Sequence, residues 1–148
     1  MAETQVQARN GSRLTAAVSR ALRESAVIAL AIVALTFASA IDDPARFKSS
    51  KSVGAHFGMT PKKYQSGETD VSGRISKIGD GGVRTVVYEA ANVILTRPVK
   101  GCASLKSWAM KLAKRAGMAK AKVALARKLT VIMHKMLADG TTFANLPG

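Results

Sequence analysis

Apolar residues recur every three or four positions in several stretches of the chain, which predicts amphipathic helices. The clearest stretches cover residues 13–41, 83–97, 105–116 and 123–139. Each of the last three is followed by a residue that commonly ends a helix, namely Pro98, Gly117 and Gly140. Nowhere do apolar and polar residues alternate as in a half-buried strand. The sequence therefore predicts an all-α fold: a small helical domain with a glycine-rich loop of the catalytic type between helices.

Two short helices are expected between residues 42 and 58. Asp43 can cap the first of them, with Pro44 in its first position. Ser49 or Ser50 can cap the second. His56 falls within this second helix, and we expect it to be partly buried rather than a metal ligand, because no second ligand lies at helical spacing.

Residues 25–41 carry no charge and read SAVIALAIVALTFASAI. Two interpretations of this stretch stay open. It is either a buried helix of a soluble fold or a secretory signal, with arginines before it and a cleavage site after Ala40. The stretch is shorter than the roughly 20 apolar residues of a spanning helix. The preceding segment is long for a signal and contains Glu24. The buried helix is the preferred interpretation.

Residues 61–82 are polar and rich in glycine and read PKKYQSGETDVSGRISKIGDGG. This composition is typical of a loop, and loops held by rigid elements often carry function. Ser66 is its candidate nucleophile, and Asp80 is placed to cap the next helix. An ordinary solvated turn is the alternative interpretation. The cations that could contact a phosphate here are Lys62, Lys63, Arg74 and Lys77.

The net charge of the chain indicates what kind of partner it binds. The chain has 23 Lys and Arg against 9 Asp and Glu, which gives a net charge of +14. No acidic residue occurs between Ala90 and Ala138, whereas a solvated helix face usually mixes both signs. A surface of one sign repels itself and favours a polyanion. Aromatic residues make up 5% of the chain, which argues against a single-strand binder that stacks bases. The single cysteine, Cys102, excludes an internal disulfide and suits a reducing, cytoplasmic setting.

Five blocks in order resemble one known family. They read DDPARFKS at 42–49, GMTP at 58–61, SGE at 66–68, GRISK at 73–77 and EAA at 89–91. They resemble the C-terminal, serine-bearing domain of bacterial insertion-sequence transposases that also have a RuvC-like DEDD nuclease half, known as bridge-RNA-guided recombinases. The resemblance divides the chain into a non-matching segment with an apolar helix, residues 1–33, and a transposase C-terminal domain, residues 34–145.

The resemblance implies a concrete chemistry. A serine at the position of Ser66 attacks a scissile DNA phosphate and holds the cut end as a phosphoserine until it is rejoined to another strand. Tyr64 is the other hydroxyl within reach and is the weaker candidate. Acidic residues of the RuvC-like half bind Mg²⁺ in the family. The residues expected to contact nucleic acid are Lys62, Lys63, Arg74, Lys77, Arg84, Lys106, Lys111, Lys114 and Arg115.

Two departures from the family shape the expected function. The RuvC-like half has no counterpart here, so this chain should hold no metal or other cofactor by itself. The family's glycine- and proline-rich turn is replaced by IALA at 28–31, which suits a truncated or frame-shifted copy. We therefore expect a transposase fragment that is inactive alone, with DNA, a guide RNA and full-length transposase protomers as partners. The alternatives are a non-catalytic basic helical protein that binds DNA or RNA and an exported or membrane-associated cationic protein. A membrane partner is not favoured.

Overall fold

The computed structural model describes residues 20–21, 24–25, 28–66 and 69–143, and for residues 63–66 and 69–72 it describes the backbone only. The first continuous helix covers residues 28–41. The elements that follow are η1 (Pro44–Arg46), α2 (Ser50–His56), β1 (Pro61–Ser66), β2 (Thr69–Ile75), α3 (Gly81–Thr96), α4 (Ala103–Ala116) and α5 (Met118–Asp139). Most of the described residues are helical, so the predicted fold class is confirmed.

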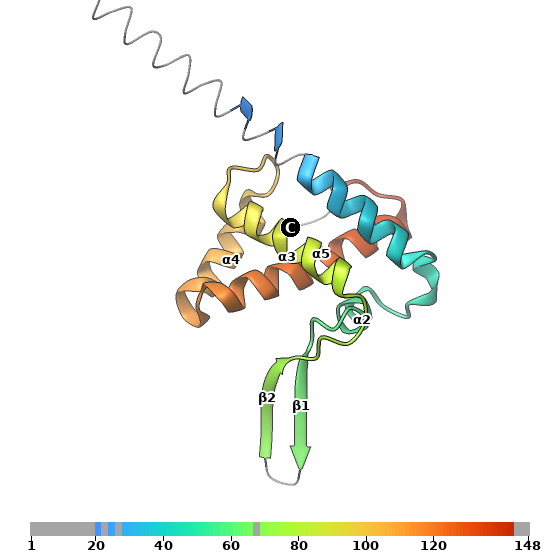
Figure 1. The fold of residues 1–148 in the computed structure, drawn as a ribbon, viewed down its shortest axis with the longest axis vertical. Helices are drawn as coiled ribbons and strands as arrows, with labels where there is room; N and C mark the ends of the chain where they lie inside the picture. Colours follow the sequence, from blue (N-terminus) through green and yellow to red (C-terminus); the bar gives the residue numbers. More distant parts are fainter. Residues whose placement is uncertain (1–19, 22–23, 26–27, 67–68, 144–148) are drawn as a thin grey trace, which may run out of the picture.

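The structure differs from the sequence prediction in residues 61–66 and 69–75, which form strands rather than a loop. β1 and β2 pair antiparallel as a two-stranded hairpin that projects from the helical body (Figure 1). A projecting hairpin need not bury either face in a core, so it requires no alternation of apolar and polar residues. The polar, glycine-containing sequence therefore gave no strand signal, and the prediction that no strand occurs was wrong here.

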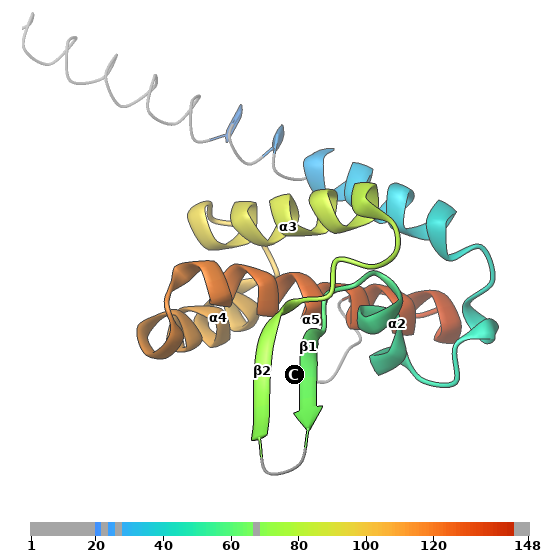
Figure 2. The same cartoon turned by 60° about the horizontal axis from the view of Figure 1, so that its bottom comes forward.

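The helices form two layers around one hydrophobic core. α3 and helix 28–41 lie in one layer over α5, and α4 and α2 pack beside α5 in the other (Figure 2). The largest fully buried side chains come from helix 28–41, the α2 region, α3 and α5, and include Phe37, Phe57, Ile94 and Leu125. The apolar face predicted for α3 is buried as expected, with Val83, Val87, Ala90, Ala91 and Ile94 in the core.

Helix 28–41 buries one face only. Phe37 and Ile41 are fully buried in the core. Ile28, Ile32 and Leu35 lie on the other face and are 61%, 55% and 72% exposed. The uncharged stretch is thus a helix packed onto the body along one side. In the part of the chain that the structure describes, no helix has the length and apolar character that crossing a membrane requires.

Two of the predicted helix starts are confirmed by their hydrogen bonds, whereas Ser49 lies at the N-cap position of α2 without a side-chain capping hydrogen bond. The Oδ1 atom of Asp43 accepts from the backbone N–H of Ala45 at 2.9 Å, with Pro44 in the first position of η1. The Oδ1 atom of Asp80 accepts from the N–H of Gly82 at 2.7 Å at the start of α3. Side-chain caps of this kind satisfy N–H groups that have no partner within the helix. They fix where η1 and α3 begin.

His56 is exposed, so the expectation that it is partly buried was wrong. α2 turns Val53 into the core, and Phe57 follows its last turn and is also buried, which leaves the intervening His56 at the surface. The His56 ring contacts the rings of Phe47 and Phe57 edge-on, with centroids 5.2 Å and 5.0 Å away.

His134 is the buried histidine of the structure, with 3% of its surface exposed. Its Nε2 lies 3.0 Å from the carbonyl oxygen of Pro44, and its Nδ1 lies 3.0 Å from the hydroxyl of Ser50. A carbonyl oxygen only accepts, so Nε2 carries the proton and donates to it, and in the neutral ring Nδ1 accepts from Ser50. His134 thus ties α5 to the two short elements that lead into the hairpin.

Candidate nucleic-acid interface

Ser66 lies at the outer end of the hairpin. It is the last residue of β1 and pairs with Thr69, the first residue of β2, so two residues connect the strands. Tyr64 pairs with Val71 further along the strand, and Lys63 pairs with Ser72. The side chains of these hairpin residues lie outside the described part of the structure. The backbone alone places the candidate nucleophile at the point of the hairpin furthest from the helices (Figure 1).

The hairpin root, residues 57–60 and 76–79, joins the hairpin to the helical body. The backbone N–H of Ser76 donates to the carbonyl of Thr60 at 2.9 Å, and that of Lys77 donates to the carbonyl of Gly58 at 3.0 Å. A Cβ on Gly58 would lie 2.1 Å from the carbonyl oxygen of Ile78. The two chain segments therefore cross in direct backbone contact, and only glycine permits this approach.

Arg84 reaches the hairpin root from the first turn of α3. Its Nη1 donates to the carbonyl oxygen of Phe57 at 3.0 Å. The same atom makes longer contacts, both at 3.5 Å, with the carbonyl oxygens of Ile78 and Gly79. The sequence pattern had suggested Arg84 as a nucleic-acid contact. The structure shows a half-buried guanidinium directed at the backbone of the protein itself.

Three other cations of the 61–82 segment lie in the hairpin root or in the strand ends next to it. Lys62, Arg74 and Lys77 have exposed side chains. Lys62 and Arg74 lie at the strand ends nearest the helices, and Arg74 is five positions along β2 from Thr69, the partner of Ser66. At about 3.3 Å per residue this separates Arg74 from the hairpin's outer end by roughly 17 Å. The backbone therefore places these three cations at the end of the hairpin nearest the helices and not beside Ser66.

A second group of cations lies on α4. Lys111, Lys114 and Arg115 are exposed, and Lys114 and Arg115 occupy the last turn of the helix. Cations are favoured there by the negative end of the helix dipole. Lys106 is half-buried, and its Nζ donates to the carbonyl oxygen of Arg97 at 3.4 Å. Three of the four cations predicted on α4 thus lie outside the core and are directed outward.

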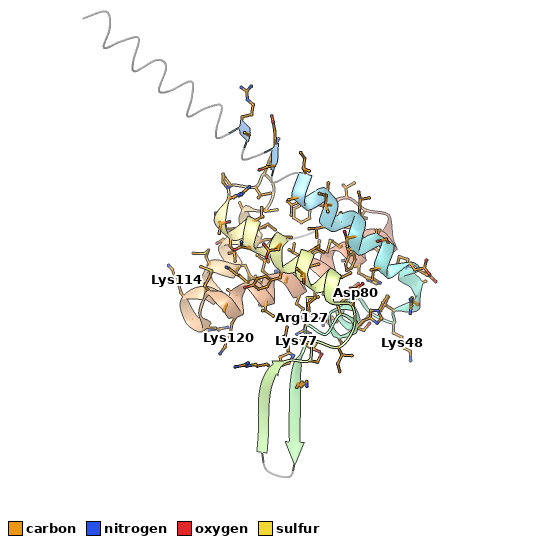
Figure 3. The ribbon with its side chains drawn as sticks, in the orientation of Figure 1. Lys48, Lys77, Asp80, Lys114, Lys120 and Arg127 are labelled. Carbon is orange, nitrogen blue, oxygen red and sulfur yellow. The ribbon has the colours of Figure 1, made fainter. Side chains whose placement is uncertain are left out.

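Lys120 and Lys128 of α5 belong to the stretch without acidic residues that was expected to face a polyanion, but they were not among the individual contacts predicted. Lys120 lies with Lys114 at the end of the body where α4 meets α5, whereas Lys48 lies at the opposite end (Figure 3). The Nζ of Lys128 lies 4.5 Å from the ring centroid of Trp108, a cation–π contact. Trp108 was expected on the buried face of α4 but is 38% exposed. The pair depends on the packing of α4 against α5, which the sequence pattern does not show.

The described residues offer no evident metal site. Among them, no three His, Cys, Asp or Glu side chains lie close enough together to hold a metal ion. Cys102 is buried beside α4, and burial raises the pKa of its thiol. A buried thiol of raised pKa is a poor nucleophile.

These features define a helical domain that carries a projecting hairpin and exposes cations on both the hairpin root and α4. Residues 29–104, just over half of the chain, match the model of the Transposase IS116/IS110/IS902 family. The chain belongs to this family. The expected relationship to insertion-sequence transposases is therefore confirmed, and a transposase-related function follows.

Individual relatives agree with this assignment. The chain is 34% identical over 113 residues to the transposase for insertion sequence element IS1111A of Coxiella burnetii, covering 76% of this chain and 31% of the relative. It is 31% identical over 107 residues to the putative transposase y4pF/y4sB of Sinorhizobium fredii, covering 72% and 28%. It is 29% identical over 113 residues to the transposase for IS1328 of Yersinia enterocolitica, covering 76% and 34%. The chain thus spans about a third of the length of the curated relatives it matches.

Proposed function

We propose that this chain is the DNA-binding, serine-bearing part of such a transposase, acting on DNA in the cytoplasm and inactive in strand transfer by itself. The observation that carries the proposal is the position of Ser66 at the outer end of a hairpin that projects from a basic helical body. A projecting hairpin can reach a phosphate while the body binds the same DNA elsewhere. Family membership makes DNA the polyanion that this charge would meet.

In the proposed reaction the Ser66 hydroxyl attacks a scissile phosphate. A bond forms between phosphorus and the serine oxygen, and the bond from phosphorus to one deoxyribose oxygen breaks. The serine proton is released, and the departing sugar oxygen takes up a proton to become a hydroxyl. Attack by the hydroxyl of another strand reverses these changes and frees the serine. A serine is a weak nucleophile until a base or metal activates it.

Magnesium, which the family resemblance implies, does not fit the described residues, since they offer no cluster of ligands. We propose that a second polypeptide with the RuvC-like half supplies it, in an assembly with full-length protomers and their guide RNA. This chain would contribute the DNA contacts and the serine.

The first prediction concerns DNA binding and its charge dependence. The chain should bind duplex DNA with a Kd of about 10⁻⁴–10⁻⁶ M at physiological salt, weakening steeply as salt rises. Replacing Lys114 and Arg115 by glutamine should reduce the slope of log K against log salt by about 1 for each phosphate that the protein no longer neutralises. Fluorescence anisotropy with a labelled duplex over a salt series measures both quantities.

The matched control is Lys48→Gln, which removes one charge at the opposite end of the body. It should leave the salt slope unchanged, because Lys48 lies away from the α4 cations. Absence of DNA binding even in dilute buffer, or an equal reduction of the slope in the control, would contradict the proposed interface.

The second prediction concerns the serine. The chain should form a covalent adduct with DNA only when a full-length family transposase is added whose own nucleophilic serine has been replaced. Ser66→Ala should abolish this adduct, because no other group would form the bond to phosphorus. Gel electrophoresis in denaturing detergent with labelled DNA detects the adduct, and Mg²⁺ is present throughout.

Two hydroxyls of the same hairpin provide the controls, as Ser72→Ala and Tyr64→Phe. Both variants should still form the adduct. An adduct that survives Ser66→Ala but disappears in Tyr64→Phe would assign the chemistry to the tyrosine. Recombinant DNA made without any added transposase would refute the proposed inactivity of the chain alone. DNA binding without any adduct would favour the second candidate function, a non-catalytic basic binder, which the exposed cations of α4 already support.

A further inference from the structure

The orientation of the hairpin depends on a small number of contacts. Both strands pair with each other and project from the body, and neither forms a layer against a helix (Figures 1 and 2). β1 spans six residues, or about 20 Å at 3.3 Å per residue. A rotation of about 10° at the hairpin root would therefore move the outer end by about 3–4 Å. Groups at the root thus control where Ser66 lies.

Arg84 is the side chain that joins the two halves of the hairpin root to α3. Phe57, whose carbonyl it binds at 3.0 Å, precedes β1, whereas Ile78 and Gly79, which it contacts at 3.5 Å, follow β2. One guanidinium thus links the segment that enters the hairpin to the segment that leaves it. Its planar set of N–H donors can serve several carbonyl groups at once.

The position of Arg84 in α3 also bears on its role. It lies in the first turn of the helix, where the N-terminal end of the helix dipole disfavours a cation. The carbonyl oxygens of the hairpin root carry partial negative charge. They therefore stabilise the positive charge of Arg84, which the dipole of α3 disfavours at this position. An arginine that served DNA could occupy any exposed position. This one is half-buried against backbone acceptors.

We propose that Arg84 is a positioning residue that sets the angle of the hairpin on the helical body and thereby the location of Ser66, and that it makes no phosphate contact. This inference rests on the proposed role of Ser66 for its functional meaning. Misplacing a reacting group by about 1 Å can reduce a rate by about 10²-fold. Removal of the guanidinium should therefore slow the chemical step while DNA affinity stays the same.

The direct test measures the hairpin angle. Spin labels are attached at Thr69→Cys, near the hairpin's outer end, and at Lys120→Cys, in the first turn of α5, in a Cys102→Ala background. Pulsed electron paramagnetic resonance then gives the distance distribution between them. Arg84→Ala should broaden this distribution at least twofold or shift its maximum by several ångströms, and Arg84→Lys should restore part of the original distribution.

Arg115→Ala is the matched control, because Arg115 is an exposed arginine of α4. It should leave the distance distribution unchanged while reducing the salt slope of DNA binding by about 1. Arg84→Ala should do the reverse, with an unchanged salt slope and at least a tenfold lower adduct yield in the complemented assay. Helical circular dichroism confirms that both variants are folded, and the lysine variant replaces Arg84→Ala if that protein does not fold.

The outcomes separate this inference from the proposed function. A distance distribution that is identical in wild type, Arg84→Ala and Arg84→Lys overturns the positioning role, whatever the protein binds. A salt slope that falls by about 1 in Arg84→Ala also overturns it, because it shows a phosphate contact. A wild-type protein that neither binds DNA nor forms an adduct refutes the proposed function, while the distance measurement still decides what Arg84 does.

Discussion

Replacing Phe37 by alanine is expected to lower the free energy of unfolding by about 3–5 kcal/mol, the range found for large aromatic side chains removed from a core. Phe37 has no exposed surface, and its ring centroid lies 5.6 Å from that of Phe57, with the ring planes inclined at 52°. The substitution would leave a cavity between helix 28–41 and the segment that leads into the hairpin. Urea titration followed by far-ultraviolet circular dichroism measures the change.

The control for this prediction lies two residues away on the same helix. Leu35 is 72% exposed, so Leu35→Ala should change the free energy of unfolding by no more than about 0.5 kcal/mol. The pair therefore tests which face of the uncharged stretch packs on the body. Equal effects of the two substitutions would show that helix 28–41 does not pack as the structure places it, and would reopen the interpretation of residues 25–41 as a signal.

The helices and their ends could be predicted from the sequence because the signals are local. Apolar residues at helical spacing in α3 reflect a single buried face, and Asp80 lies directly before the N–H groups that it caps. Gly117 and Gly140 have the positive φ angles, 90° and 62°, that favour glycine after a helix. None of these features requires knowledge of residues far away in the chain.

The hairpin could not be predicted in the same way. Its register pairs Tyr64 with Val71 and Ser66 with Thr69, but neither strand shows apolar alternation, since the projecting hairpin covers no core. The role of Arg84 depends on Phe57, 27 residues earlier in the chain. From the sequence, Arg84 is one of many cations in a basic protein. Only the tertiary structure shows that its guanidinium faces backbone carbonyl groups.

The candidate site stays a prediction, but parts of its setting can be compared with the structure. The sequence indicated cations on α4, and Lys111, Lys114 and Arg115 are exposed, while the backbone places Ser66 at the end of β1. It also suggested that Arg74 and Lys77 face the phosphate attacked by Ser66. The register places Arg74 five positions along β2 from Thr69, the partner of Ser66, and Lys77 follows the end of that strand, so neither backbone position lies beside Ser66. The catalytic role of Ser66 stays a prediction.

Gly79→Ala is expected to disturb the attachment of the hairpin root to α2. Gly79 has a φ angle of +90°, and a Cβ at this position would lie 2.1 Å from the carbonyl oxygen of His56. The left-handed backbone costs an alanine about 1–2 kcal/mol, and relieving the overlap with α2 adds about 1–3 kcal/mol. We expect the free energy of unfolding to fall by about 2–5 kcal/mol in total, as measured by urea titration.

Gly117→Ala separates the two contributions, because Gly117 also has a φ angle of +90° but no atom lies within 4 Å of the position of its Cβ. This variant should show only a backbone contribution, about 1–3 kcal/mol, because its φ of 90° and ψ of 156° form a conformation that is essentially restricted to glycine. The excess in Gly79→Ala then measures the close approach between the hairpin root and α2. Since that approach belongs to the same root that Arg84 joins to α3, Gly79→Ala should also broaden the distance distribution between labels at Thr69→Cys and Lys120→Cys. Equal decreases of stability in the two glycine variants would show that the segments do not cross in contact, and the hairpin would then lack the rigid attachment from which the position of Ser66 is argued.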